Sequence, residues 1–220
     1  IMPSLVGSEM CIRDRANLYY MDYENQLVLT GALDAVGEPI RTNSGDSYRF
    51  GLEIEAAIQF AEQWVWQPNL ALSSNKNKDF YFKRDGQLQN LGTTNISYSP
   101  NVVGASNLVF APSTVFRVAL LSKYVGEQFM GNIDEDLSKL EAYFTNDINI
   151  SYVWTPNSWI KEAQFSLLVN NIFNALYTSN GYFYTFDDDY SVAGVVTTIE
   201  GVGYYPQAGT NFLMGATFRF

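Results

Sequence analysis

The last ten residues of the sequence decide the fold: Asn211-Phe212-Leu213-Met214-Gly215-Ala216-Thr217-Phe218-Arg219-Phe220. Every second residue from Phe212 to Phe220 is apolar, and the residues between them are mostly polar. This period of two predicts a β-strand with one apolar face. Such a face either packs on a second sheet or contacts lipid, and the rest of the chain bears on these two alternatives.

Seven earlier segments show a similar alternation, most clearly residues 48–60. A strand of this length exceeds the usual five or six residues of globular strands and suits a tilted membrane strand of about ten residues with its rims. In the first segment, Tyr19, Met21 and Tyr23 are assigned to the apolar face. Pro100 and Gly104 indicate a bulge or bend. We expect the remaining strands at residues 17–29, 64–73, 96–110, 116–124, 143–154 and 164–177.

The connections between these segments alternate in length. The short ones are residues 61–63, 111–113 and 155–162, and the long ones are residues 30–47, 74–95, 126–140 and 178–210. Successive antiparallel strands would place all short turns at one end and all long loops at the other. This asymmetry is typical of outer-membrane barrels, whereas an eight-stranded soluble β-sandwich, the alternative, usually mixes loop lengths.

Aromatic residues also gather near the two ends of the strands, as in the interfacial girdles of membrane barrels. Near the short turns these are Phe60, Trp64, Trp66, Phe110, Phe116, Trp154 and Phe220. Near the long loops they are Tyr48, Phe50, Tyr98, Tyr124, Phe144 and Phe212. The middle of the assigned apolar faces carries no charge, which would cost about 2–4 kcal/mol for Arg or Lys in lipid. The pattern favours an all-β, antiparallel up-and-down transmembrane barrel segment of eight strands, as an open or loosely closed sheet.

Composition excludes several functions. The chain has 23 Asp and Glu against 13 Lys and Arg, a net charge of −10, so it lacks a basic stripe for nucleic acid. It has no histidine and a single cysteine, Cys11, so no Ser-His-Asp or Cys-His site can form. No apolar run approaches the roughly 18–20 residues of a membrane helix. We therefore expect no enzyme activity, no metal site and no cofactor.

Residues 1–15 lack the alternation of the remaining chain. Residues 4–15 look like translated sequencing adapter. We interpret residues 1–15 as a non-native or disordered tail and residues 16–220 as the barrel portion. The alternative is a genuine, irregular N-terminal tail.

Two segments carry a resemblance to a known family. Residues 169–177, Val-Asn-Asn-Ile-Phe-Asn-Ala-Leu-Tyr, and the terminal residues 215–220 resemble the C-terminal end of TonB-dependent outer-membrane receptors. Residues 25–33 and 41–55 are similar to a strand, loop and strand of such receptors. The resemblance implies that residues 16–220 are the last third of a twenty-two-stranded barrel closed around an N-terminal plug that is absent here.

The resemblance also implies a function and partners. It implies TonB-energised uptake of a scarce nutrient, of which a ferric-siderophore-type complex is preferred, through contact of the TonB complex with the missing plug. It implies the outer membrane of a Gram-negative bacterium, a periplasmic C-terminus and contact with outer-membrane lipid. Phe218 and Phe220 resemble the signal read by the barrel-assembly machinery. The alternative is a complete small eight-stranded outer-membrane protein of structural or adhesive role.

Several residues are candidates for sites. Aromatic side chains in the longest loop could contact a small-molecule or metal-chelate ligand, or pack the loop on itself; these are Tyr182, Tyr184, Tyr204 and Tyr205. Charged residues of the polar faces are expected to face the lumen and to pair with the plug or with each other; these are Arg49, Glu53, Glu55, Arg117 and Lys123. Residues 134–136 and 187–189 are acidic but lack the twelve-residue spacing of a calcium loop, which favours solvated charge.

Overall fold

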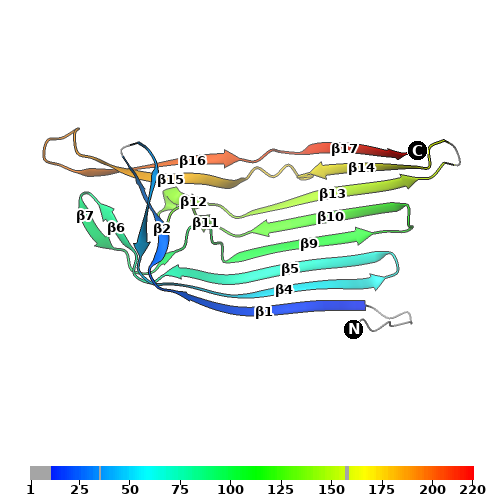
Figure 1. Ribbon diagram of the computed structural model, residues 1–220, viewed down its shortest axis with the longest axis horizontal. Coiled ribbons are helices and arrows are strands. Elements are labelled where there is room, and N and C mark those ends of the chain that lie inside the picture. The colour runs from blue at the N-terminus through cyan, green and yellow to red at the C-terminus, as the bar shows by residue number, and fades with distance from the viewer. Residues whose placement is uncertain (1–10, 35, 157–158) are drawn as a thin grey trace.

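The computed structural model describes residues 11–34, 36–156 and 159–220. Its main sheet has eight long strands that follow one another in sequence order, each antiparallel to the next (Figure 1). They are β1 (Cys11–Tyr23), β4 (Ser47–Ala61), β5 (Trp64–Asn77), β9 (Val102–Phe110), β10 (Phe116–Val125), β13 (Tyr143–Trp154), β14 (Glu162–Asn170) and β17 (Asn211–Arg219). A two-residue strand, β8 (Thr94–Asn95), pairs with the end of β5. The sheet is open, with β1 and β17 at its edges, so the predicted fold class is confirmed.

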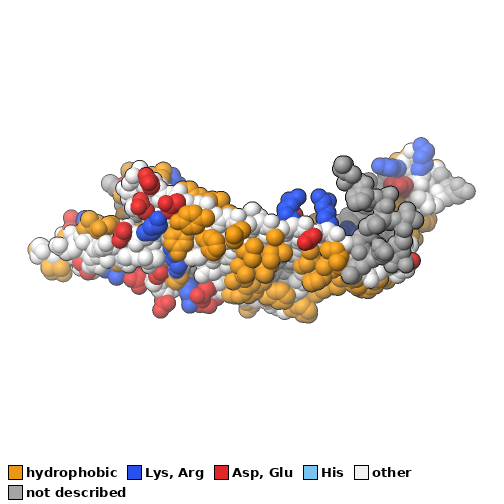
Figure 2. All heavy atoms as spheres, turned by 90° about the horizontal axis from the view of Figure 1, so that it is seen from below, with side chains coloured by type: hydrophobic (Ala, Val, Ile, Leu, Met, Phe, Trp, Pro, Cys, Tyr) orange, Lys and Arg blue, Asp and Glu red, His pale blue; other side chains and the backbone are white. Residues whose placement is uncertain are grey.

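The sheet separates its side chains into an apolar and a polar face. One row of apolar residues crosses all eight strands without interruption, and it consists of Ile12, Ile58, Trp66, Leu108, Leu120, Ile148, Val169 and Phe212. Figure 2 shows hydrophobic side chains gathered along one side of the sheet. In a β-sandwich this face would be buried, yet Leu18 is 69% and Phe212 is 72% exposed. An exposed apolar face of this extent indicates contact with lipid or another protein.

The face assigned to β1 from the sequence was wrong. Leu18 lies opposite Leu52 and Tyr20 opposite Phe50, so the even-numbered residues are on the apolar face. Tyr19 and Met21 are on the polar face, and so is Tyr23. Residues 18–21 are all apolar or aromatic, so alternation alone does not fix their orientation. The register with β4 fixes it, because a shift of one residue exchanges the two faces.

β1 also begins earlier than expected. Residues 11–15 of the predicted tail pair with residues 55–59 of β4, and they are therefore strand residues and not disordered. Residues 1–10 of the tail lie outside the described residues. The non-native origin of the tail stays a prediction.

Three predicted strands are interrupted because the backbone turns within them. Asn25 has a φ of 52° and ends β1, so the continuation of the chain leaves the main sheet. Tyr98 has a φ of 50° just before Pro100, so β9 begins only at Val102, the bend is confirmed, and Tyr98 is not in a strand. Asn171 has a φ of 51° and ends β14. Asparagine adopts this left-handed conformation more readily than most residues do. A residue in this conformation cannot continue an extended strand.

The four long connections contain secondary structure of their own, and apart from residues 26–29 it was predicted as loop. These segments are β2 (Gln26–Leu33) and β3 (Pro39–Ser44), β6 (Tyr81–Arg84) and β7 (Gln87–Asn90), β11 (Gln128–Phe129) and β12 (Lys139–Leu140) with the 3-10 turn η1 (Asp136–Ser138), and β15 (Thr178–Asp188) and β16 (Thr197–Pro206). We call residues 24–46, 78–101, 126–142 and 171–210 together the cap. In Figure 1 the cap lies at the left end of the sheet and the short turns lie at the right.

The cap brings together parts of the chain that the sheet keeps apart. β1 and β17 are at opposite edges of the sheet, yet β2 pairs in parallel with β15 at Ala32 and Thr185. The first and the last long connections therefore meet across the end of the sheet (Figure 1).

Candidate functional site

The cap has a small hydrophobic core of its own. Val28 of β2, Phe80, Phe82 of β6 and Ile133 are 2–6% exposed and pack together, with Leu91 and Phe183 against them. These residues come from all four long connections. Burial of such a side chain contributes about 1.5–3 kcal/mol, so this core holds the connections to one another.

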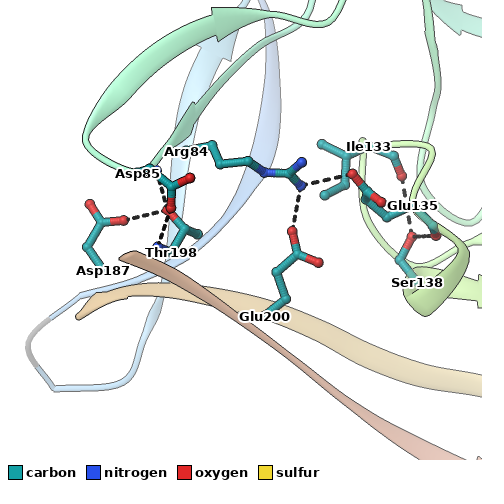
Figure 3. Close-up of polar contacts among 8 residues, drawn as sticks. All are labelled: Arg84, Asp85, Ile133, Glu135, Ser138, Asp187, Thr198 and Glu200. Atoms are coloured by element: carbon teal, nitrogen blue, oxygen red, sulfur yellow. Dashed lines mark hydrogen bonds and ion pairs between the residues drawn. The ribbon is translucent and has the colours of Figure 1, made fainter. Parts of the chain in front are cut away.

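Arg84, at the end of β6, joins three of the connections through ion pairs (Figure 3). Its Nη2 atom lies 2.9 Å from Oε1 of Glu135 and 2.5 Å from Oε1 of Glu200. The hydrogen bond to Glu135 and the two nearby carboxylates raise the pKa of Arg84. Glu135 is held in place by its own turn, because its carbonyl oxygen accepts a hydrogen bond from the Ser138 hydroxyl.

A second group of contacts ties the β6–β7 turn to the β15–β16 hairpin. Nζ of Lys83 lies 2.8 Å from Oδ2 of Asp187, and the other oxygen of Asp187 accepts from the Thr198 hydroxyl. Asp85 accepts a hydrogen bond from the Thr198 amide, and the Asp85 amide donates to the Thr198 hydroxyl (Figure 3). The ammonium of Lys83 lowers the pKa of Asp187.

Of these residues, only Glu135 and Asp187 lie in the acidic runs that were singled out in the sequence, and they were interpreted there as solvated charge. The roles of Lys83, Arg84, Thr198 and Glu200 were not predicted. Arg84 and Glu200 are 116 positions apart, and no local spacing connects them. The partners become visible only when the strands are paired.

The four predicted ligand-contact tyrosines lie on the β15–β16 hairpin, but on two faces. Tyr182 and Tyr184 stack at 6.2 Å between ring centres, and Tyr205 is 5.8 Å from Tyr182. The fourth, Tyr204, points to the opposite face and donates to the carbonyl of Leu137. Tyr182 and Tyr205 are about half exposed and Tyr184 is half-buried, and these three tyrosines form an aromatic row on one face of the hairpin.

Two glycines make this row possible. Gly203 lies opposite Tyr182, and Gly201 lies opposite Tyr184. Each tyrosine ring lies across the glycine on the neighbouring strand, where a Cβ atom would collide with it. The glycines thus allow the rings to lie flat on the hairpin.

The five charged residues predicted for the lumen all lie on the polar face of the sheet. Three of them already have partners there. Arg49 donates to Asn75 at 3.3 Å and to Ser99 at 3.0 Å, Glu53 accepts from Asn17 at 3.1 Å, and Glu55 pairs with Arg15 at 3.2 Å. Arg117 and Lys123 are on the same face, with both residues exposed.

A shallow hollow of about 500 Å³ lies over this polar face. It is lined by polar residues such as Asn17, Glu53 and Asn69 and also by apolar residues, among them Ile54 and Leu70. An open hollow of this kind leaves room for further protein or for solvent against the sheet.

Phe218 and Phe220 lie at the short-turn end of the sheet. Phe218 contacts Phe165 edge-on at 6.1 Å between ring centres, and Phe220 stacks on Trp159 at 5.1 Å. Nζ of Lys161 donates to the carbonyl oxygen of Phe220 at 2.8 Å. The last strand is thereby fixed to the preceding turn, while both phenylalanine rings stay about half exposed or more.

The described residues contain no helix long and apolar enough to cross a membrane. Within the same residues, no group of three or more His, Cys, Asp or Glu side chains is arranged to hold a metal ion. In the acidic run at 187–189, the Asp188 carboxylate accepts hydrogen bonds from the amides of Tyr190 and Ser191.

An open antiparallel sheet with one exposed apolar face, short turns at one end and long connections at the other is the arrangement found in the walls of outer-membrane β-barrels. No protein-family model and no curated protein matches the sequence. Solved structures do match it. The alignment with the ferric-catecholate import receptor Fiu from E. coli covers 94% of this chain and 25% of the Fiu chain, at 18% identity and a TM-score of 0.60.

Two further receptors match in the same way. The ferric yersiniabactin uptake receptor FyuA from Yersinia pestis covers 95% of this chain and 28% of its own, at 16% identity and a TM-score of 0.59. The alignment with the copper transporter OprC covers 95% of this chain and 29% of OprC, at 18% identity and a TM-score of 0.62. The chain thus has the fold of a barrel segment of TonB-dependent outer-membrane receptors and spans about a quarter of their length.

Proposed function

We propose that this chain is the C-terminal part of the barrel of a TonB-dependent receptor that takes up a scarce nutrient across the outer membrane. The observation that carries the proposal is the structural match of nearly the whole chain to one segment of such receptors. The open sheet supports it over a complete eight-stranded barrel, in which β1 and β17 would pair with each other.

The preferred substrate is a ferric-siderophore-type complex. Two of the matching proteins are named for ferric siderophore or catecholate uptake, and a third is named a copper transporter. The row of Tyr182, Tyr184 and Tyr205 supplies flat aromatic surface for an organic chelate. Tyr204 has the different role of holding the hairpin against the neighbouring connection.

The same proposal gives each part of the chain a place. The apolar face contacts lipid, the cap is outside the cell, and the short turns and the C-terminus are periplasmic. Arg49, Glu53, Glu55, Arg117 and Lys123 face the lumen and the plug. Phe218 and Phe220 address the barrel-assembly machinery, and the plug that precedes this segment contacts the TonB complex.

Uptake experiments with the full-length receptor that contains this chain test the proposal. A Gram-negative host without its own siderophore receptors is grown under iron limitation with ferric catecholate or ferric hydroxamate complexes. A copper-limited culture tests copper in parallel. We expect one ferric complex to support growth in a host with TonB and not in one without TonB. Growth that is independent of TonB, or a receptor absent from the outer-membrane fraction, would refute the proposal.

The tyrosine row is tested in the same host. Replacing Tyr182, Tyr184 and Tyr205 together by alanine should weaken ligand binding about tenfold or more, since each aromatic contact is worth about 0.5–1.5 kcal/mol beyond the buried area. Tyr190→Ala is the matched control, because Tyr190 lies on the same long connection and is 78% exposed. Equal effects of the triple variant and the control would contradict a role of the tyrosine row in ligand binding.

A further inference from the structure

The four long connections of the cap contribute to one shared hydrophobic core. The β6–β7 hairpin has two strands of four residues each, and an isolated two-stranded hairpin of this size is at best marginally stable in water. Its buried residues Phe80 and Phe82 pack against Val28 and Ile133 of other connections. The β6–β7 hairpin therefore depends on the other connections for its apolar contacts.

Arg84 concentrates the polar contacts between connections at one point. Its side chain is 30% exposed, and those of Glu135 and Glu200 are 42% and 23% exposed, so the ion pairs are partly shielded from solvent. Its guanidinium carbon is also 5.5 Å from the centre of the Phe82 ring, which links the ion pairs to the hydrophobic core. Loss of the arginine would leave two carboxylates facing each other across three connections.

Further contacts reach the remaining connection and the rim of the sheet. β2 pairs with β15, and this pairing couples the last hairpin to the first connection. Lys78 pairs with Asp22 at the end of β1, with 2.7 Å between Nζ and Oδ1. The network thus extends from one edge strand of the sheet to the connection that precedes the other.

We propose that the cap is a single gate, in which the four connections open and close together and Arg84 is the latch that couples them. The gating role of the cap rests on the proposed transport function, since a gate needs a ligand to admit. The coupling of the connections does not depend on transport and can be measured without it.

Hydrogen exchange of the full-length receptor in detergent micelles tests the coupling. Arg84→Gln removes the charge and both ion pairs. We expect amide exchange to rise about five- to tenfold in β6–β7, in residues 126–142, in β15–β16 and in β2 together. Arg41→Gln, an exposed arginine of β3 in the same cap, is the matched control and should leave exchange unchanged.

A rise confined to β6–β7 would overturn the proposal, because the connections would then open one by one. A swap of the charges at positions 84 and 200 provides a second test. Arg84→Glu should speed exchange in all four connections, and adding Glu200→Arg should restore at least part of the protection. Absence of any restoration would also overturn the latch. Loss of uptake in the unmodified receptor would refute the transport function alone, because the exchange result stands without a ligand.

Discussion

The sheet and the cap solve the problem of stability in different ways. The sheet has an uninterrupted backbone ladder and an apolar face that stays exposed. The cap has short hairpins, a core of a few side chains and ion pairs between distant residues. The sheet is thus held together by its backbone ladder, whereas the cap is held together by side-chain contacts between its connections.

Charge follows the same division. The cap contains fifteen Asp and Glu and five Lys and Arg, so it carries the whole net charge of −10, while the rest of the chain is balanced at eight and eight. Four of the five cap cations pair with carboxylates; these are Lys78, Lys83, Arg84 and Lys139. An acidic surface of this kind is readily hydrated.

The largest expected effect comes from removing the cap core. Phe80 is 2% exposed, and its replacement by alanine should cost about 3–5 kcal/mol of local stability. We expect proteases added to intact cells to cleave the cap connections while the barrel stays in the membrane. Phe173→Ala, at a side chain that is 73% exposed, is the control and should not increase cleavage. If the whole barrel were lost as well, the cap and the sheet would be one folding unit.

The next effect distinguishes the two faces of the sheet. Leu120→Arg places a charge on the apolar face and should destabilise the barrel by about 2–4 kcal/mol, measured by urea unfolding in lipid vesicles. Leu121→Arg places the same charge one residue further on, on the polar face, and should have little effect. Equal destabilisation by both variants would contradict the assignment of the faces.

A smaller effect is expected where the sheet meets the cap. Asn171 accepts from the Ala175 amide and donates to the carbonyls of Ala175 and Ala208. Asn171→Gly keeps the left-handed backbone and loses these bonds, at a cost of about 1–3 kcal/mol. Asn171→Ala should cost about 1 kcal/mol more, because alanine resists a φ of 51°. Urea unfolding in vesicles checks both, and no difference between the two variants would mean that the turn adopts another conformation.

The smallest effect concerns pH and the cap alone. Lys83 lowers the pKa of Asp187 below its usual value of 3.8. The stabilisation from this pair is therefore complete above about pH 4 and is lost as the pH falls through the lowered pKa. Protection factors in β15–β16, which are corrected for the intrinsic pH dependence of amide exchange, should fall on acidification in the unmodified receptor, and Asp187→Asn should already show the lower protection at pH 6. Asp189→Asn serves as the control, and an identical response of both variants would remove this pair from the cap's stability.

Much of the sheet was predictable because its information is local. A period of two in Tyr48–Phe60 or Phe212–Phe220 states which side chains share a face, and seven of the eight strands were assigned correctly in this respect. The alternation of short and long connections placed the ends of the strands. These signals lie within about ten residues of sequence, so they need no knowledge of the partner strand.

The tertiary structure alone decided the orientation of β1, the split of the tyrosines and the partners of Arg84. Residues 18–21 have no polar position to mark a face, and only the pairing of Leu18 with Leu52 orients them. The contacts of Arg84 with Glu135 and Glu200 span 51 and 116 positions, and they exist only because the strands bring the four connections to one end of the sheet. The period of two indicates which side chains of one strand share a face. Contacts between separate connections produce no periodic pattern in the sequence.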